Sequence, residues 1–363
     1  MKRSDLVNKL KQVQAGLALN DYVPLFACFC FNGKTVVAYN DVVALQAPCP
    51  LEVKGAVKGA VLLGFLSATR VPEVELSSQD GDIHIKAGRA KLKLPVIAEP
   101  GDFVFKWPDD KGEAIPFGKE AMEMLAYCTP SMGTDPSRRM MMGVTIAFDG
   151  EKNKATLYST DNKSASRSVI EFSEAQWKMP KSFHDKAVIL PPRFCELLLS
   201  NASEKLSELV MGDGWVKAVF ETGLKLFSRT IPDADPQAYK GLFSPMVGKD
   251  MNDKYVAIPK GIERALERSL VVIASKDDTV KLTVKGEVLT LETSSSYGVA
   301  KDVLRMEGHE DEMVEAQPSI LARVLATSEE MAIVGGSCVA FRRGRCYHLV
   351  SVVGTAADTK SEE

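Results

Sequence analysis

Apolar residues recur along the chain with two different spacings, and the first of these predicts helices. Six segments place large apolar side chains three and four residues apart, which is typical of helices with one buried face. Four of the segments carry proline in or near the first turn, where its missing N–H costs no hydrogen bond. The predicted helices span about residues 4–17 and 57–68 and begin near residues 116, 191, 259 and 318. In the first two, the expected buried residues are Leu6, Leu10, Val13, Leu17, Val57, Val61 and Phe65.

Short apolar runs separated by turn residues lie between these helices. Asn32-Gly33, Asp80-Gly81 and Asp213-Gly214 favour the tight turns of β-hairpins, and Gly286 and Gly344 mark two more. Hairpins in place of long crossovers indicate antiparallel sheets with helices on one face. The order helix, strands, helix, strands recurs three times, with a period of roughly 120 residues. We therefore expect an α+β fold of three repeated domains, at residues 1–112, 113–246 and 247–363.

The composition is that of an ordinary globular protein. Of 363 residues, 45% are hydrophobic and 26% are charged, and no run approaches the roughly 20 apolar residues that span a bilayer. The first residues lead into a helical pattern rather than a signal peptide, so we expect a cytoplasmic protein with no membrane partner. The seven cysteines include no Cys-x-x-Cys pair, which favours reduced cysteines packed as small hydrophobic residues.

Motifs for chemistry are missing from the sequence. Gly335-Gly336 is not followed by the Gly-Lys-Ser/Thr of a phosphate-binding loop, and no nucleophile elbow or His-x-x-x-His zinc pair occurs. The four histidines are scattered, and His348, in the last predicted strand, is expected to be structural. We therefore predict no catalytic residue, no metal ligand and no cofactor.

Two stretches in the middle of the chain resemble the β-type sliding clamps of bacterial DNA polymerase III. Leu157–Asp161 stands where that family has a Thr-Asp-Gly-His-Arg-Leu stretch, and Phe227–Tyr239 is similar to its strand and Phe-Pro-Asp-Tyr segment. The third predicted domain matches the family in layout. The low similarity in letters elsewhere is typical of a remote member, such as a phage-encoded one.

The resemblance implies a ring. Each domain of such a clamp supplies two helices to the inner wall, the sheets form the outer layer, and two chains joined head to tail encircle duplex DNA. Such a homodimer is a processivity factor that tethers the replicative DNA polymerase and is placed on DNA by a clamp loader. Weak contacts to phosphates, blind to sequence, suffice for a ring that slides.

The net charge of −3 is unusual for a protein that binds DNA, and its distribution bears on the question. Windows drawn around the six predicted helices hold thirteen basic and eight acidic residues, so they carry +5 and the rest of the chain carries −8. A positive inner wall within an acidic protein would focus the field on the central hole. The residues expected to face DNA, including two on a loop that the family uses near DNA, are Lys2, Arg3, Lys9, Lys11, Lys54, Lys58, Arg138, Arg139, Arg193, Lys260, Arg264, Arg268 and Arg323.

The resemblance also implies a hydrophobic pocket for partner peptides between the second and third domains. The family's Gly-His-Arg-Leu is replaced here by Asn162-Lys163-Ser164-Ala165, so the preferred peptide does not carry over. The matching positions are Met141, Thr160, Lys163, Ser164, Ala165, Pro236, Leu242, Val352 and Val353. The seam between chains is expected at Val104, Phe105, Val272 and Ile273.

Two other functions stay open at the level of sequence. A clamp-like protein could act only as an adaptor between proteins, but the division of charge favours DNA. An unrelated α+β enzyme is disfavoured because no catalytic constellation is present.

Overall fold

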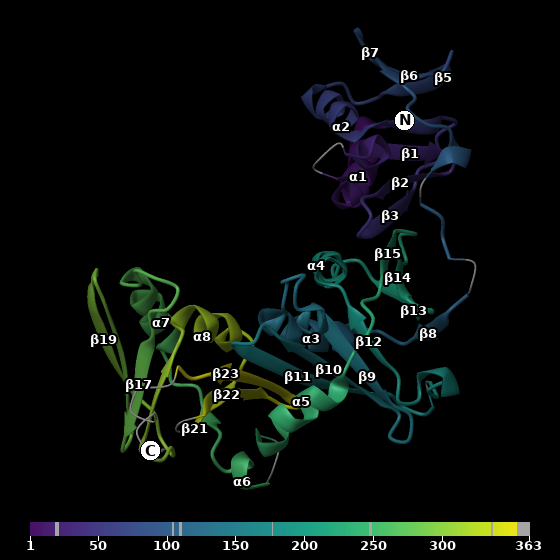
Figure 1. Ribbon diagram of the computed structural model, residues 1–363. Helices are drawn as coiled ribbons and strands as arrows, with labels where there is room; N and C mark the ends of the chain where they lie inside the picture. Colours follow the sequence, from purple (N-terminus) through teal and green to yellow (C-terminus); the bar gives the residue numbers. More distant parts are fainter. Residues whose placement is uncertain are drawn as a thin grey trace. The chain divides into compact units, whose positions relative to one another are not determined.

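The computed structural model describes residues 1–18, 22–103, 105–108, 111–175, 177–246, 249–334 and 337–353. Its contacts divide the chain into two compact units (Figure 1). Unit 1 comprises Met1–Gly118 and Arg193–Thr230, and unit 2 comprises Lys119–Pro192 and Ile231–Glu363. Residues 354–363, whose lack of large apolar side chains predicts a loose tail, lie outside the described residues. No helix in the described part of the chain is long and apolar enough to cross a membrane.

An eight-stranded sheet forms the centre of unit 1. It joins strands from the first and second predicted domains, because β3 pairs antiparallel with β15. Its order is β4(Lys54–Lys58), β1(Cys28–Asn32), β2(Thr35–Tyr39), β3(Val43–Pro48), β15(Lys225–Arg229), β14(Trp215–Phe220), β13(Leu206–Met211) and β8(Glu113–Ile115). A three-stranded meander is separate and consists of β5(Glu75–Gln79), β6(Asp82–Ala87) and β7(Ala90–Pro95).

Three helices belong to this unit: α1(Arg3–Val13), α2(Gly59–Ala68) and α4(Pro192–Ser200). Helix α1 buries Leu6, Leu10 and Val13 as predicted. The predicted stripe of the second helix is wrong, because α2 buries Leu62, Leu63 and Leu66 while Val61 is exposed and Val57 lies in β4. Residues 59–68 carry no charge, so the three-and-four spacing fits more than one face of this helix and cannot select the buried one.

Unit 2 contains a second eight-stranded sheet, in which β11 pairs antiparallel with β23. Its order is β12(Ala187–Leu190), β9(Val144–Asp149), β10(Lys154–Thr160), β11(Ser164–Glu171), β23(Cys346–Ser351), β22(Cys338–Arg343), β21(Glu330–Val334) and β16(Val256–Ala257). A four-stranded sheet follows the order β19(Gly298–Arg305), β18(Val288–Ser295), β17(Val280–Lys285) and β20(Glu312–Ala316).

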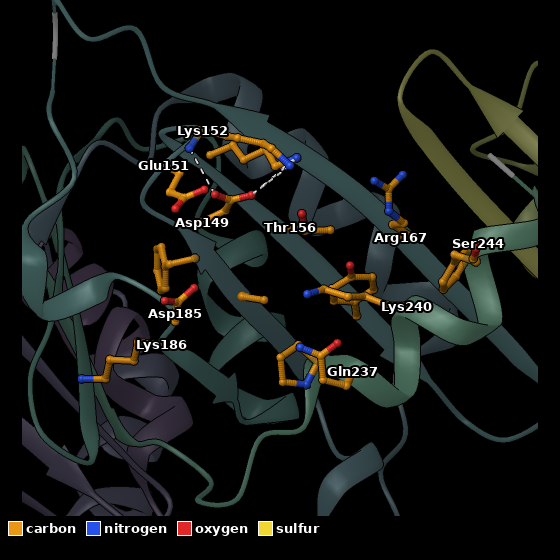
Figure 2. Close-up of a pocket in the computed structure, with 16 residues that line it drawn as sticks. Asp149, Glu151, Lys152, Thr156, Arg167, Asp185, Lys186, Gln237, Lys240 and Ser244 are labelled. Carbon is orange, nitrogen blue, oxygen red and sulfur yellow. Dashed lines mark hydrogen bonds and ion pairs between the residues drawn. The ribbon is translucent and has the colours of Figure 1, made fainter. Parts of the chain in front are cut away.

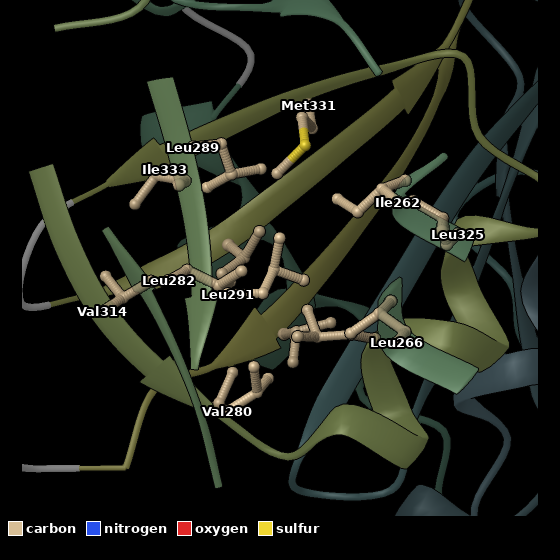
Figure 3. Packing of buried hydrophobic residues seen from close by; sticks show 14 of the residues in the cluster. Ile262, Leu266, Val280, Leu282, Leu289, Leu291, Val314, Leu325, Met331 and Ile333 are labelled. Carbon is tan, nitrogen blue, oxygen red and sulfur yellow. The ribbon is translucent and has the colours of Figure 1, made fainter. Parts of the chain in front are cut away.

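The helices of unit 2 are α3(Lys119–Cys128), α5(Pro236–Phe243), α6(Lys249–Asn252), α7(Ile262–Val271) and α8(Pro318–Leu325). Helices α7 and α8 share one apolar core with strands of both sheets (Figure 3). Leu266 of α7 and Leu325 of α8 meet Leu282, Leu291 and Ile333 of the strands in this core, and all five are almost fully buried. Burial of such side chains contributes about 2 kcal/mol each.

Opposite faces of the second eight-stranded sheet carry different neighbours. On one face, the ring of His348 in β23 stacks on Tyr127 of α3, with centroids 3.8 Å apart. On the other face, Ala165 and Leu349 pack in a cluster with Tyr239 and Phe243 of α5. The alternation of neighbouring residues along a strand explains this division.

The predicted hairpin turns are confirmed. At Asp80-Gly81 both residues have positive φ, +53° and +78°, as a two-residue turn between right-twisted strands requires. The apolar run Leu25–Phe31, which predicts the first strand, is extended only from Cys28 onward, because residues 24–27 form a 3₁₀ turn ahead of β1. Proline at its start lacks the N–H that a strand would use.

A buried histidine gives the first testable prediction. The ring nitrogens of His348 lie 2.6 Å from the hydroxyl of Ser166 and 2.9 Å from that of Thr327. Burial, together with the positive charges of Arg343 and Arg323, lowers the pKa of His348 to about 3 from 6.5. The unfolded chain therefore binds this proton more readily, and stability that is complete above pH 6.5 is lost as the pH falls from 6.5 toward 3.

Below pH 6.5, the free energy of unfolding should fall more steeply in the wild type than in His348→Gln, by up to about 1 kcal/mol per pH unit. Urea unfolding at pH 7.5, 6 and 5 measures both slopes, and the glutamine keeps a hydrogen-bonding side chain at this position. Parallel slopes for the two proteins would contradict the assignment.

Candidate nucleic-acid interface and partner pocket

Most residues expected to face DNA are exposed, and they lie on several kinds of element. Lys11, Arg193 and Arg264 are exposed on helices. Lys54 and Lys58 are exposed at the two ends of β4 rather than on α2. Arg138 and Arg139 are exposed at the 3₁₀ turn before β9, whereas Arg3 is half-buried and donates to the carbonyl of Leu66 at 2.9 Å. The remaining residues of the set are Lys2, Lys9, Lys260, Arg268 and Arg323.

The structural bounds of the helices reduce the predicted charge excess. Within α1, α2, α3, α4, α7 and α8 there are eight basic and six acidic residues, a net charge of +2. The drawn windows gave +5 because they also took in five basic and two acidic residues outside the helices. Four of the basic residues precede a helix, and the seven residues are Lys2, Lys54, Lys58, Arg70, Lys260, Glu329 and Glu330. The positive charge therefore collects at the entrances to the helices as much as along them.

Ion pairs already engage several of the basic residues. Arg268 on α7 holds the carboxylate of Asp302 in β19 with two nitrogens, at 3.0 and 2.6 Å. Arg323 on α8 donates to Asp161 at 2.5 Å, and Arg193 pairs with Glu196 at 3.1 Å. In contrast, Lys11, Arg139 and Arg264 form no ion pair within the described residues, so their charges are available to phosphates.

The stretch that carried the resemblance forms a tight turn between β10 and β11. The Oδ1 of Asp161 accepts the backbone N–H groups of Lys163 and Ser164 at 3.1 and 2.7 Å. The hydroxyl of Thr160 donates to the carbonyl of Ser164 at 2.8 Å. Arg323 closes the turn through the second oxygen of Asp161. This part of the expected partner pocket is therefore held rigidly by hydrogen bonds.

Several other residues of the expected pocket are brought to this turn. The carbonyl of Lys163 accepts the backbone N–H of Ser351 at 2.9 Å, so Val352 and Val353 follow directly beside the turn. Val352 packs against the core of the four-stranded sheet. Ala165, by contrast, is buried in the cluster beneath α5 and is a core residue.

Helix α5 supplies Pro236 and Leu242, and the sequence did not predict it as a helix. Its start could have been found, because Asp235 caps the backbone N–H of Gln237 at 2.9 Å and Pro236 occupies the first turn. The hydroxyl of Tyr239 in α5 donates to the carbonyl of Met140 at 3.2 Å, which places Met141 near the helix. Leu242 is 46% exposed and is free to contact a partner.

A pocket of about 520 Å³ lies between α5 and the face of β9, β10 and β11 (Figure 2). It is more polar than the predicted site and shares only Pro236 with it. Lys152 and Lys154 pair with Asp149 at 3.7 and 3.8 Å, while Arg167 lies on the sheet side and Lys240 on α5. Because its lining carries paired charges of both signs, this pocket is polar and differs from the hydrophobic pocket that was expected.

Of the residues expected at the seam between chains, those that the structure describes lie in an aromatic cluster in unit 1 and at the end of a helix in unit 2. Phe105 packs on Tyr39 and Phe227 inside unit 1, with ring centroids 5.0 and 5.2 Å away. Val272 and Ile273 are half-buried just after α7, where the hydroxyl of Ser295 donates to the carbonyl of Val272. Val104 lies outside the described residues.

The cysteines and other residue types that bind metals form no metal-binding cluster within the described residues. None of the seven cysteines forms a disulfide, and six of them are buried. In the part of the chain that the structure describes, no group of three His, Cys, Asp or Glu side chains could hold a metal ion.

Several solved structures of sliding clamps share this arrangement. The DNA polymerase sliding clamp of Bacillus subtilis aligns with a TM-score of 0.83 at 14% identity, over 98% of each chain. The Helicobacter pylori β clamp bound to a DNA ligase peptide aligns with a TM-score of 0.79, and the DNA polymerase III β subunit of Thermotoga maritima with 0.80. Both are 16% identical over 98% of this chain and 99% of theirs.

No model of a known protein family matches the sequence, and no curated protein matches it. The structural likeness nevertheless covers nearly the whole chain, so the protein has the DNA clamp fold. The expected α+β fold of repeated clamp elements is confirmed. At these identities the likeness establishes the fold.

Proposed function

We propose that this protein is a DNA sliding clamp: a ring that encircles duplex DNA, without regard to sequence, and tethers a DNA polymerase and other partners. The whole-chain clamp fold is the observation that carries the proposal. Exposed basic residues on the helices and at their entrances support it. Because a ring retains DNA topologically, a small positive excess is sufficient. The protein acts as a scaffold in the cytoplasm, with no chemical step of its own.

The pairing pattern of the strands supports a ring made of two chains. Each of six helices, α1, α2, α3, α4, α7 and α8, precedes a three-stranded meander, and the third strands of these meanders are β3, β7, β11, β15, β19 and β23. Third strands pair with one another, β3 with β15 and β11 with β23. Strands β7 and β19 are the two third strands that remain, and each forms one of the two edges of its own sheet in the described chain.

An open edge strand exposes unpaired backbone groups that favour pairing with another chain. We infer that β19 of one protomer pairs with β7 of its partner, and that two such seams close a homodimeric ring. The repeat also supports the division into domains at residues 1–112, 113–246 and 247–363, since each holds two meanders. Val299 and Val303 on β19 are exposed, and Val272 and Ile273 lie beside the same edge of the sheet.

The partner pocket is proposed at the turn 160–165, beside Val352, Val353 and α5. Exposed Leu242 and the rigid turn support a site for a hydrophobic peptide side chain. Such a peptide would belong to the polymerase or to the clamp loader.

Reversing three charges together, Lys9→Glu, Lys58→Glu and Arg264→Glu, should weaken retention on circular DNA at least tenfold at low salt, because phosphate contacts are lost. Retention is measured by co-elution of the labelled protein with nicked circular plasmid after loading. The triple variant Lys111→Glu, Lys181→Glu and Lys285→Glu, off the six helices, is the matched control. Equal retention by both variants would rule out the assigned DNA-facing surface.

The seam predicts the effect of charge on one edge of the four-stranded sheet. Val299→Asp combined with Val303→Asp should convert a dimer near twice 39.5 kDa into a monomer, because two charges would be desolvated at the seam. Sedimentation or light scattering measures the mass. The control is Met313→Asp, which alters an exposed apolar residue on β20 at the other edge of the same sheet. A dimer that survives the double change would place the seam elsewhere.

Leu242→Asp should abolish binding of the cognate polymerase while leaving DNA retention and dimer mass unchanged, because a carboxylate replaces the apolar contact on α5. Surface plasmon resonance with immobilised polymerase measures the loss, expected to be at least tenfold. Val288→Asp, at another exposed valine, serves as the control. Undiminished polymerase binding by Leu242→Asp would show that the pocket is assigned to the wrong residues.

A further inference from the structure

The junction between β3 and β15 in unit 1 repeats the local structure of the proposed partner pocket. In the turn between β2 and β3, the Oδ1 of Asn40 accepts the backbone N–H groups two and three residues later, at 3.2 and 3.0 Å. In the turn between β10 and β11, Asp161 does the same at 3.1 and 2.7 Å. The next residue, Asp41 or Asn162, has a φ of +73° in both turns. The two turns are therefore built alike.

The strand that faces each turn also makes the same contact. The hydroxyl of Ser228, at the end of β15, donates to the carbonyl of Val42 at 2.9 Å. The hydroxyl of Ser351, at the end of β23, donates to the carbonyl of Lys163 at 2.9 Å. Val42 thus occupies the place at this junction that Lys163 occupies at the proposed partner pocket.

A pocket of about 480 Å³ lies at this junction, within the size range of ligand sites. Its floor is aromatic: Trp215 and Phe227 are buried with ring centroids 6.0 Å apart, and Phe105 and Tyr39 continue the cluster. Val42, at the rim, is 52% exposed. An apolar floor with an exposed apolar rim suits an inserted aliphatic or aromatic side chain.

Cations surround this aromatic floor. Lys106 and Arg229 line the pocket, and the amines of Lys217 and Lys225 lie 5.7 and 5.8 Å from the ring centroids of Trp215 and Trp107. None of these four cations has an ion-pair partner within the described residues. The acidic residues of the lining are Asp41, which accepts a hydrogen bond from the hydroxyl of Tyr39, and Asp213. The charge favours an anionic occupant.

The shape of the site favours a peptide over single-stranded nucleic acid. Bases stack on exposed aromatic faces, but here Trp215 and Phe227 are buried against each other and lysines lie over the tryptophan rings. A concave pocket with one apolar rim residue accepts a side chain rather than a row of bases.

We propose that the β3–β15 junction is a second peptide-docking site, which takes a segment with an aliphatic or aromatic anchor beside carboxylate side chains. The proposal deepens the proposed clamp function, because it compares this junction with the partner pocket of that function. A chain with two such pockets would hold two partners, or two motifs of one partner, at once.

The probe is the fluorescein-labelled pentapeptide Asp-Asp-Ser-Leu-Phe, titrated against the full-length protein carrying Leu242→Asp, so that the other pocket is disabled. Anisotropy measures binding, and tryptophan fluorescence reports where it occurs, since Trp107 and Trp215 at the junction are two of the three tryptophans. Binding with a tryptophan response is expected. Absence of binding at millimolar protein would overturn the proposal.

Adding Val42→Asp should weaken this binding at least tenfold, whereas Val61→Asp, at a valine that is 45% exposed on α2, should leave it unchanged. Lys106→Glu combined with Arg229→Glu should transfer the preference to Lys-Lys-Ser-Leu-Phe, which a loss of folding could not produce. A decamer of deoxythymidine serves as the nucleic-acid probe. If the decamer binds and the peptide does not, and if Val42→Asp weakens binding of the decamer, the peptide assignment is refuted. DNA retention by these variants tests the clamp function separately, so the two failures can be told apart.

Discussion

Antiparallel pairing between strands far apart in the sequence is the constraint on which the rest of this structure depends. Strand β3 pairs with β15 about 180 residues later, and β11 pairs with β23 at a similar separation. Each eight-stranded sheet is therefore joined in its middle by one such long-range strand pair. Without this pairing, each half of these sheets would leave the backbone N–H and C=O groups of its edge strand unpaired. Long-range pairing of this kind also costs the most chain entropy to form, and the buried clusters on the sheets offset that cost.

The same pairing rule organises the surfaces proposed to bind partners. Where two third strands pair, the turn before one strand lies beside the end of the other. At each junction an Asn or Asp side chain accepts backbone N–H groups of the turn, and a serine hydroxyl donates to a carbonyl of the turn. Apolar side chains lie beneath both junctions. The connecting segment then covers the junction, as a helix in unit 2 and as the stretch around Phe105 in unit 1. The proposed docking sites therefore lie where the repeats meet, and they differ in the side chains that rim them.

The net positive charge of the six helices is smaller than the sequence indicated. Within the helix bounds of the structure the net charge is +2. Arg268 and Arg323 form ion pairs with Asp302 and Asp161. Both pairs are partly exposed and contribute at most about 1 kcal/mol each to stability. The proposed ring would hold DNA by topology, so it would tolerate so weak a field, and weak contacts would let it slide.

The sequence by itself determined the class of fold, the six repeated helices and most hairpins. These features depend on local periodicity and on turn residues such as Asp80-Gly81, which act over a few positions. Tertiary structure alone decided which face of α2 is buried, and that Ala165 is core while Leu242 is exposed. It also decided which strands meet, because pairing across about 180 residues depends on edges and buried faces that no local pattern records.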